Sequence, residues 1–530
     1  MFTKRSAFST GMLFLLLFAT ACGSAAATRQ APAATEAPAY NYVPQPAPTY
    51  GAPAPFTRGS GSTASGQPSA SSNSQPYDMF FQDYGVNPSI DTEDDHLSTF
   101  GLDVDTGSYT VMRNYLANGN LPPSDSVRVE EYVNYFEQGY SGPTAHQAFG
   151  INIDGASSPF GRDGNYKMLR IGIQGYKVSE EERKDASLVF VIDVSGSMDM
   201  DNRLGLVKRS LQLLVKKLRP GDTVSIVVYG TQAHVVLGPT SGAEKDVILA
   251  SIYSLHPEGV TNAEAGIRLG YKMAMRAYNP NGINRVILCS DGVANMGETS
   301  PGGILDEIKD HVREGVTLTT VGFGMDNYND TLMEQLADNG DGFYAYVDNI
   351  TEARRLFIEN LTSTLQVIAM NAKVQVDFNP SVVANYRLVG FENRDIADDQ
   401  FRNNNVDAGE IGAGNTSTAL YEVKLRPEAY GRAATVFMRW EDPDTHSIVE
   451  ISKDFDAAGL QGDFHEADPY FQRSVVVAEY AEILRESYWA KGSRIADIYE
   501  EALRLTDLLP NDDDLREFVD LARQAGELSQ

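Results

Sequence analysis

The strongest constraint on the fold is an alternation of strand-like and helix-like segments between residues 186 and 365. The strand-like segments are apolar on both faces, as in LVFVID at 188–193 and VILCS at 286–290. Strands of this kind, alternating with helices, form a parallel sheet covered by helices on both sides. We therefore predict a doubly wound, mainly parallel α/β domain at 186–366. The expected strands are 188–193, 223–229, 286–290, 316–323 and 343–347, and the expected helices are 203–218, 243–255, 262–278, 303–314, 331–338 and 351–365.

The segments on either side of this block show a different periodicity. At 146–185 and 367–460, apolar and polar residues alternate with period two, which is typical of antiparallel strands with one face exposed to solvent. Because such strands both precede and follow the α/β block, we predict that the block is inserted into one antiparallel β-sandwich. The remaining folded parts are expected to be a small helical unit at 77–145 and a helical segment at 461–530.

The N-terminus has the pattern of a secretory signal peptide. A basic start is followed by seven apolar residues at 12–18, a stretch too short to span a bilayer, and then by ATAC ending at Cys22. ATAC resembles the lipobox of bacterial lipoproteins, although Ala19 stands where leucine is usual. The resemblance implies a signal peptide at 1–22, a diacylated Cys22 and an extracytoplasmic, membrane-anchored protein at the cell surface or in the periplasm. Ordinary secretion with cleavage near Ala21 is the alternative.

Residues 23–76 are rich in Pro, Ala, Ser and Gly, and such a composition cannot bury enough apolar surface to fold. We interpret this segment as a disordered tether that would hold the folded part roughly 40 Å from a membrane.

The composition disfavours several kinds of partner. The formal net charge is -29 at pH 7, so nucleic acid and anionic membrane surfaces are poor candidates, whereas divalent cations are reasonable ones. Cys289, the only cysteine besides Cys22, lies in an apolar run and is expected in the core, so no intramolecular disulfide is predicted.

Oxygen-bearing side chains gather where the predicted parallel strands end. Asp193, Ser195 and Ser197 follow the first strand, Thr261 precedes a helix, and Asp291 follows the strand at 286–290. In an open parallel sheet, ligands bind outside the carboxyl ends of the strands. We therefore expect these side chains to meet at one edge of the sheet.

The residue types at this edge favour a metal site. A serine nucleophile needs a base such as His, but none of the 7 histidines lies in these loops. A phosphate site requires a cation, and two carboxylates would oppose a phosphate. Carboxylate and hydroxyl oxygens suit Mg²⁺, and with only two carboxylates the ion would still attract a carboxylate from outside.

Three motifs extend this prediction. DVSGS after an apolar strand, GVTN about seventy residues later and SDG after a second apolar strand resemble the von Willebrand factor A domain over residues 186–365. Ser290 stands where threonine is common in that family. The resemblance implies a metal-ion-dependent adhesion site formed by Asp193, Ser195, Ser197, Thr261 and Asp291. It also implies Mg²⁺, with Mn²⁺ or Ca²⁺ as alternatives, and a protein partner whose Asp or Glu side chain completes the coordination.

The whole chain resembles bacterial lipoproteins in which such a domain is embedded between dedicated N- and C-terminal domains. On this reading, the protein is a non-enzymatic adhesion protein of the cell envelope. An envelope assembly or structural protein with a vestigial metal site is a second reading.

The segment DVDTGS, from Asp103 to Ser108, allows a third reading as a hydrolase. Asp-Thr-Gly occurs in aspartic proteases, but those enzymes need a second catalytic aspartate, and the motif occurs only once here. The favoured interpretation is a helix start at which Asp105 or Ser108 accepts backbone N–H bonds.

The anchoring prediction can be tested with a Cys22→Ser variant. Because the acyl chains would be the only strong membrane contact, this variant should move from the membrane fraction to the soluble extracytoplasmic fraction, as measured by fractionation and immunoblotting. Cys289→Ala should stay with the membranes. If Cys22→Ser still sediments with membranes after a salt wash, the lipoprotein prediction is wrong.

Overall fold

The computed structural model describes residues 79–144, 147–160, 166–200, 202–292, 308–325 and 328–529. The predicted signal peptide, Cys22 and the predicted tether lie outside these residues. Among the residues that are described, no helix is both long enough and apolar enough to span a membrane.

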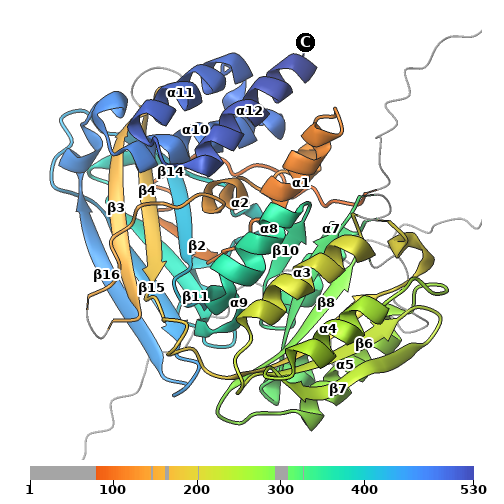
Figure 1. Cartoon of the computed structure of the whole chain (residues 1–530). Coiled ribbons are helices and arrows are strands. Elements are labelled where there is room, and N and C mark those ends of the chain that lie inside the picture. Colours follow the sequence, from red (N-terminus) through yellow and green to blue (C-terminus); the bar gives the residue numbers. More distant parts are fainter. Residues whose placement is uncertain are drawn as a thin grey trace, which may run out of the picture. The chain divides into compact units, whose positions relative to one another are not determined.

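The predicted α/β domain is present as a six-stranded sheet with the order β10-β9-β8-β5-β6-β7 (Figure 1). All neighbouring strands are parallel except β7, an antiparallel edge strand that the sequence analysis did not predict. The strands are β5 (Ala186–Asp193), β6 (Thr223–Tyr229), β7 (Ala233–Ser241), β8 (Ile283–Ser290), β9 (Thr317–Phe323) and β10 (Tyr344–Val347). The helices include α3 (Leu204–Lys217), α4 (Lys245–Ser254), α5 (Ala263–Arg276) and α7 (Asp330–Asp338).

The apolar character of β5 on both faces is explained by two separate cores. Leu188, Phe190 and Ile192 pack in the core that contains α3 and α4, whereas Val189 and Val191 pack in the core that contains α5 and α7. A strand covered on both faces has no face for polar residues, so its polar residues follow at its end.

Two predicted helices differ from expectation. The helix expected at 351–365 is divided into α8 (Ile350–Arg354), a π-helical turn (Arg355–Glu359) and α9 (Leu361–Leu365). At this turn the Arg355 side chain donates hydrogen bonds to two residues outside the domain, to the carbonyl of Tyr135 and to the carboxylate of Asp514. The helix expected at 303–314 lies partly outside the described residues.

The flanking strands form one antiparallel β-sandwich, as predicted. One sheet has the order β1-β12-β14-β4-β3, and the other contains β13-β11-β15-β16 with β2 paired to β11. The first sheet consists of β1 (Ile90–Asp91), β3 (Phe149–Ser157), β4 (Tyr166–Gly175), β12 (Val383–Val389) and β14 (Thr416–Leu425). The second consists of β2 (Leu97–Gly101), β11 (Val367–Phe378), β13 (Gly409–Gly412), β15 (Arg432–Glu441) and β16 (Ile448–Asp456).

The α/β domain is entered and left at adjacent points of this sandwich. The Lys184 N–H donates to Gln366 Oε1 at 3.0 Å, which joins the two connecting segments. Strand β4, before the domain, pairs along its length with β14, after the domain. The ring centroids of Phe149 and Trp440, from opposite sheets, lie 5.0 Å apart in the core between them.

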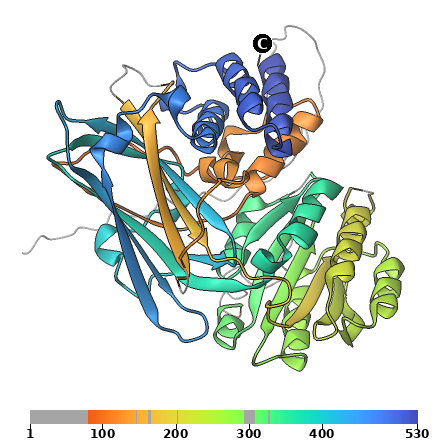
Figure 2. The same cartoon turned by 60° about the vertical axis from the view of Figure 1, so that its left-hand side comes forward.

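A layer of helices covers the first sheet of the sandwich. Helices α1 and α2 from the N-terminal part share one core with α10, α11 and α12 and with sheet residues Ala156, Met168 and Leu420 (Figures 1 and 2). The bounds are α1 (Gly107–Ala117), α2 (Val129–Asn134), α10 (Pro469–Leu484), α11 (Ile495–Leu508) and α12 (Asp513–Leu528).

Buried ion pairs connect this helical layer to the α/β domain. Arg128, which precedes α2, pairs with Glu131 and lies 2.8 Å from Asp330 of α7. All three side chains are buried. Removing one partner of a buried pair leaves an uncompensated charge, which costs more than the pair itself contributes.

An Arg128→Met variant should therefore lower the free energy of unfolding by about 3–5 kcal/mol, as measured by chemical denaturation. Arg313→Met is the matched control, because its pair with Asp310 is 74% and 73% exposed, and it should cost less than about 1 kcal/mol. Equal losses in the two variants would show that the buried pairs do not hold the layers together.

Candidate metal centre at the rim of the parallel sheet

The five predicted site residues lie on three segments at the carboxyl edge of the parallel sheet. Asp193 is the last residue of β5, and Ser195 and Ser197 follow in its loop. Asp291 directly follows β8, which is the parallel neighbour of β5. Thr261 directly precedes Asn262, the N-cap residue of α5.

Hydrogen bonds hold the Asp193 carboxylate and the two serines in place. Asp193 Oδ1 accepts the Ser195 N–H at 2.8 Å, and its Oδ2 accepts the Ser290 hydroxyl at 3.2 Å. The Ser195 and Ser197 hydroxyl oxygens lie 3.0 Å apart. Asp193 and Ser195 are buried, whereas Ser197 is exposed, so the loop runs from the core to the surface.

The segment before Thr261 lies against the Asp193 loop. The Gly196 N–H donates to the Gly259 carbonyl at 3.0 Å, and the Glu258 N–H donates to the Val194 carbonyl at 2.5 Å. Gly259 has φ +75°, and a Cβ there would lie 1.9 Å from Thr231 Oγ1, so the close approach requires glycine. These contacts bring half-buried Thr261 to the same edge as Asp193.

A buried arginine that the sequence analysis missed completes the site. Arg203 Nη1 donates to Asp291 Oδ2 and to the Ser197 carbonyl, each at 2.7 Å, and Nη2 donates to the Met325 carbonyl. A signal was present in the sequence, because a cation at the start of a predicted helix opposes the helix dipole. Such a residue needs an acidic partner elsewhere in the fold.

Burial raises the pKa of both carboxyl groups. The pKa of Asp193 rises to about 6 because the group is buried, against hydrogen bonds from Ser195 and Ser290 that lower it, and neighbouring Asp291 raises it further. Burial also raises the pKa of Asp291, against Ser197 and Arg203, which lower it. A positive charge brought to the site would therefore favour the ionised form of both carboxyl groups.

The donor set fits a hard divalent cation. The carboxylates of Asp193 and Asp291 and the hydroxyls of Ser195, Ser197 and Thr261 offer only oxygen, the ligand type that Mg²⁺ and Ca²⁺ prefer. Arg203 already neutralises part of this charge, which limits how strongly the site alone would hold an ion.

Side chains of the segment from Asp103 to Ser108 form hydrogen bonds with other parts of the fold. The Ser108 hydroxyl donates to the Ser126 carbonyl at 2.5 Å and accepts the Arg128 N–H at 2.9 Å. Asp105 Oδ1 accepts the Tyr344 N–H at 3.3 Å. Ser108 and Asp105 thus accept backbone N–H bonds, as predicted, but from Arg128 and Tyr344. The predicted cap of the helix itself is wrong, because neither residue bonds an N–H of α1 and its N-cap residue makes no side-chain bond.

Models of three protein families match successive parts of the chain. The model "von Willebrand factor type A domain" matches residues 187–364, which contain the predicted metal centre. A model described as "von Willebrand factor" matches residues 75–169, and one described as "Uncharacterized protein YfbK, C-terminal" matches residues 363–528.

Two relatives and one solved structure illustrate the similarity. The chain is 40% identical to YfbK of Escherichia coli over 352 residues, which cover 65% of this chain and 61% of that protein. It is 28% identical to inter-alpha-trypsin inhibitor heavy chain H1 of Sus scrofa over 172 residues, 31% of this chain and 19% of that protein. A von Willebrand factor type A structure from Catenulispora acidiphila is 15% identical, with a TM-score of 0.41, covering 66% of this chain and 81% of that one.

The chain thus spans less than two thirds of either relative. The residues matched by the von Willebrand factor type A model are those that form the six-stranded sheet and its helices. The protein therefore contains a von Willebrand factor type A domain at residues 187–364, placed between N- and C-terminal regions that match family models of their own.

Proposed function

We propose that this protein is a non-enzymatic, surface-anchored binding protein whose von Willebrand factor type A domain holds Mg²⁺ and, through the ion, an acidic side chain of a partner protein. The proposed ligands are Asp193, Ser195, Ser197, Thr261 and Asp291. The observation that carries the proposal is the gathering of these oxygen groups from three segments at one edge of the sheet. The bound ion would supply the positive charge that recognises a carboxylate.

The charge balance at the site favours an acidic partner. Asp193 and Asp291 supply two negative charges and Arg203 one positive charge, so one negative charge is in excess. A divalent cation would reverse this to one positive charge in excess. A carboxylate from a partner would then neutralise the site, and Coulomb attraction is strong where water is partly excluded.

Exposed apolar side chains flank the proposed ligands. Met200, three residues after Ser197, is 52% exposed, and Val260, directly before Thr261, is 69% exposed. Apolar residues beside a polar centre are typical of protein interfaces. They support a protein as the partner rather than a free carboxylate ion.

Asp193→Ala should reduce Mg²⁺ affinity at least about tenfold, because loss of even an outer-shell partner of a metal typically costs 10–100-fold. Isothermal titration calorimetry on the full chain would measure this. Asp199→Ala is the control, since Asp199 is exposed and lies in the same loop, and it should bind Mg²⁺ as the wild type does. Equal Mg²⁺ binding by wild type and Asp193→Ala would mean that the motif is structural.

Arg203→Gln should raise the affinity for Mg²⁺, whereas Asp193→Ala should lower it. Without the guanidinium, Asp291 keeps its full negative charge, so Mg²⁺ affinity should rise by roughly tenfold, while affinity for an acidic partner should fall because the ion is better neutralised. Arg203→Lys retains the charge and should change Mg²⁺ affinity little. A fall in Mg²⁺ affinity in Arg203→Gln would show that Arg203 only supports the loop.

A further inference from the structure

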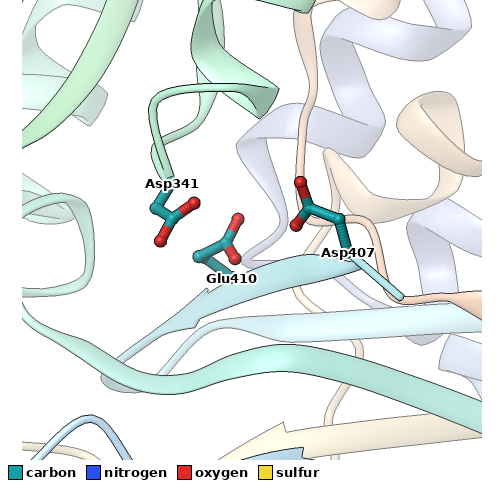
Figure 3. Close-up of side chains that lie close together, drawn as sticks. All are labelled: Asp341, Asp407 and Glu410. Carbon is teal, nitrogen blue, oxygen red and sulfur yellow. The ribbon is translucent and has the colours of Figure 1, made fainter. Parts of the chain in front are cut away.

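A second group of carboxylates lies where the parallel sheet meets the β-sandwich. One oxygen each of Asp341, Asp407 and Glu410 lies within 4.8 Å of the others (Figure 3). Asp341 stands in the turn before β10, at the amino end of that strand, whereas Asp193 ends its strand on the opposite edge of the sheet. Asp407 and Glu410 belong to the segment that enters and forms β13 of the sandwich. The cluster therefore joins two parts of the fold and is separate from the metal centre described above.

Glu410 supplies an observation that is independent of the clustering of the three carboxylates. Its Oε1 is shielded from solvent and has no hydrogen-bond partner among the described residues. Figure 3 shows the Glu410 carboxylate between those of Asp341 and Asp407. A buried carboxylate oxygen without a partner is costly, so a proton, a cation or an ordered water is needed to satisfy it.

The cluster also lacks a basic partner of the kind that several buried acids of this protein have. Glu482, for example, lies between Arg387 and Arg485. In the described part of the chain, no Lys, Arg or His nitrogen lies within 4.0 Å of Asp341, Asp407 or Glu410 in an ion pair. Exposed Lys309 lowers the pKa of Asp341 and of Asp407 from a distance, and Arg394 and Lys373 also lower the pKa of Asp407.

The three groups consequently resist ionisation together. Burial raises the pKa of Asp341 to about 7, with further increases from Asp407 and Glu441. Burial, then Asp341 and Asp407, raise the pKa of Glu410 well above its usual range. Three neighbouring carboxylates of this kind either share protons or share a cation.

We propose that Asp341, Asp407 and Glu410 bind a Ca²⁺ ion that links the von Willebrand factor type A domain to the β-sandwich. Ca²⁺ takes about 6–8 oxygen ligands in flexible geometry, whereas Mg²⁺ demands near-ideal octahedral geometry and is usually bound by only one or two carboxylates. Three carboxylates contributed by two separate parts of the fold therefore suit Ca²⁺ better than Mg²⁺. Exposed Asp407 leaves room for the water ligands that Ca²⁺ commonly adds.

The test uses the full chain carrying Asp193→Ala, so that the proposed adhesion site contributes little and the two sites can fail independently. This parent chain should bind one Ca²⁺ by isothermal titration calorimetry. Adding Asp341→Asn or Glu410→Gln should weaken that binding at least about tenfold, since each removes a direct charged ligand. Asparagine suits position 341, because Asp341 has φ +44° and asparagine tolerates this conformation. Glu428→Gln, at an exposed acid with φ +56°, is the control and should leave Ca²⁺ binding unchanged.

Thermal unfolding supplies a second readout. Ca²⁺ should raise the melting temperature of the parent but not that of Asp341→Asn or Glu410→Gln, whose melting temperatures without Ca²⁺ should equal or exceed the parent's because repulsion is relieved. If the variants at the two half-buried positions both unfold, Asp407→Asn, at an exposed position, takes their place in the titration. No Ca²⁺ binding by the parent, or equal binding by parent and variants, would overturn the proposal in favour of shared protons. Mg²⁺ binding as tight as Ca²⁺ binding would overturn the choice of ion.

Discussion

The burial of β5 on both faces is the constraint on which the rest of the central domain depends. Its odd and even residues face two different cores, so neither face can carry polar groups. Chemistry can then appear only where the strand ends, and Asp193 stands at that point. Strands β6 and β8 on either side of β5 bring their own ends to the same edge. The location of the candidate metal centre thus follows from the apolar pattern of a single strand.

The charged groups of this protein are used in two contrasting ways. Between the helical layer and the central domain, buried acids are paired with arginines, as in the contacts of Arg128 and of Arg113 with Asp348. At the candidate metal centre and at the Asp341 cluster, carboxylates have fewer basic partners than their charge requires. The first arrangement stabilises contact between layers, and the second leaves attraction for a cation.

Local periodicity was sufficient to predict the fold class and the insertion of the α/β domain into a sandwich. It also predicted that Asp193 and Asp291 would follow strands at one edge of the sheet, because sequence alone determines which residues follow an apolar strand. It could not reveal contacts between distant residues. Arg203 was missed because Asp291, its partner, is 88 residues away. Strand β2 was missed because a short segment became a strand only by pairing with β11. The Asp341 cluster was missed because its members come from two parts of the fold.

The insertion also has a consequence for the order in which the chain can fold. Strands β3 and β4 are synthesised before the central domain, but β14, which pairs with β4 through contacts such as Leu169 with Tyr421, is synthesised only after it. The β4 edge of the β3–β4 hairpin therefore stays unpaired while the central domain, whose strands follow one another in the chain, can already form. The first sheet of the sandwich can close only after the central domain has been synthesised, and until then the unpaired edge of β4 is open to pairing with strands of other chains.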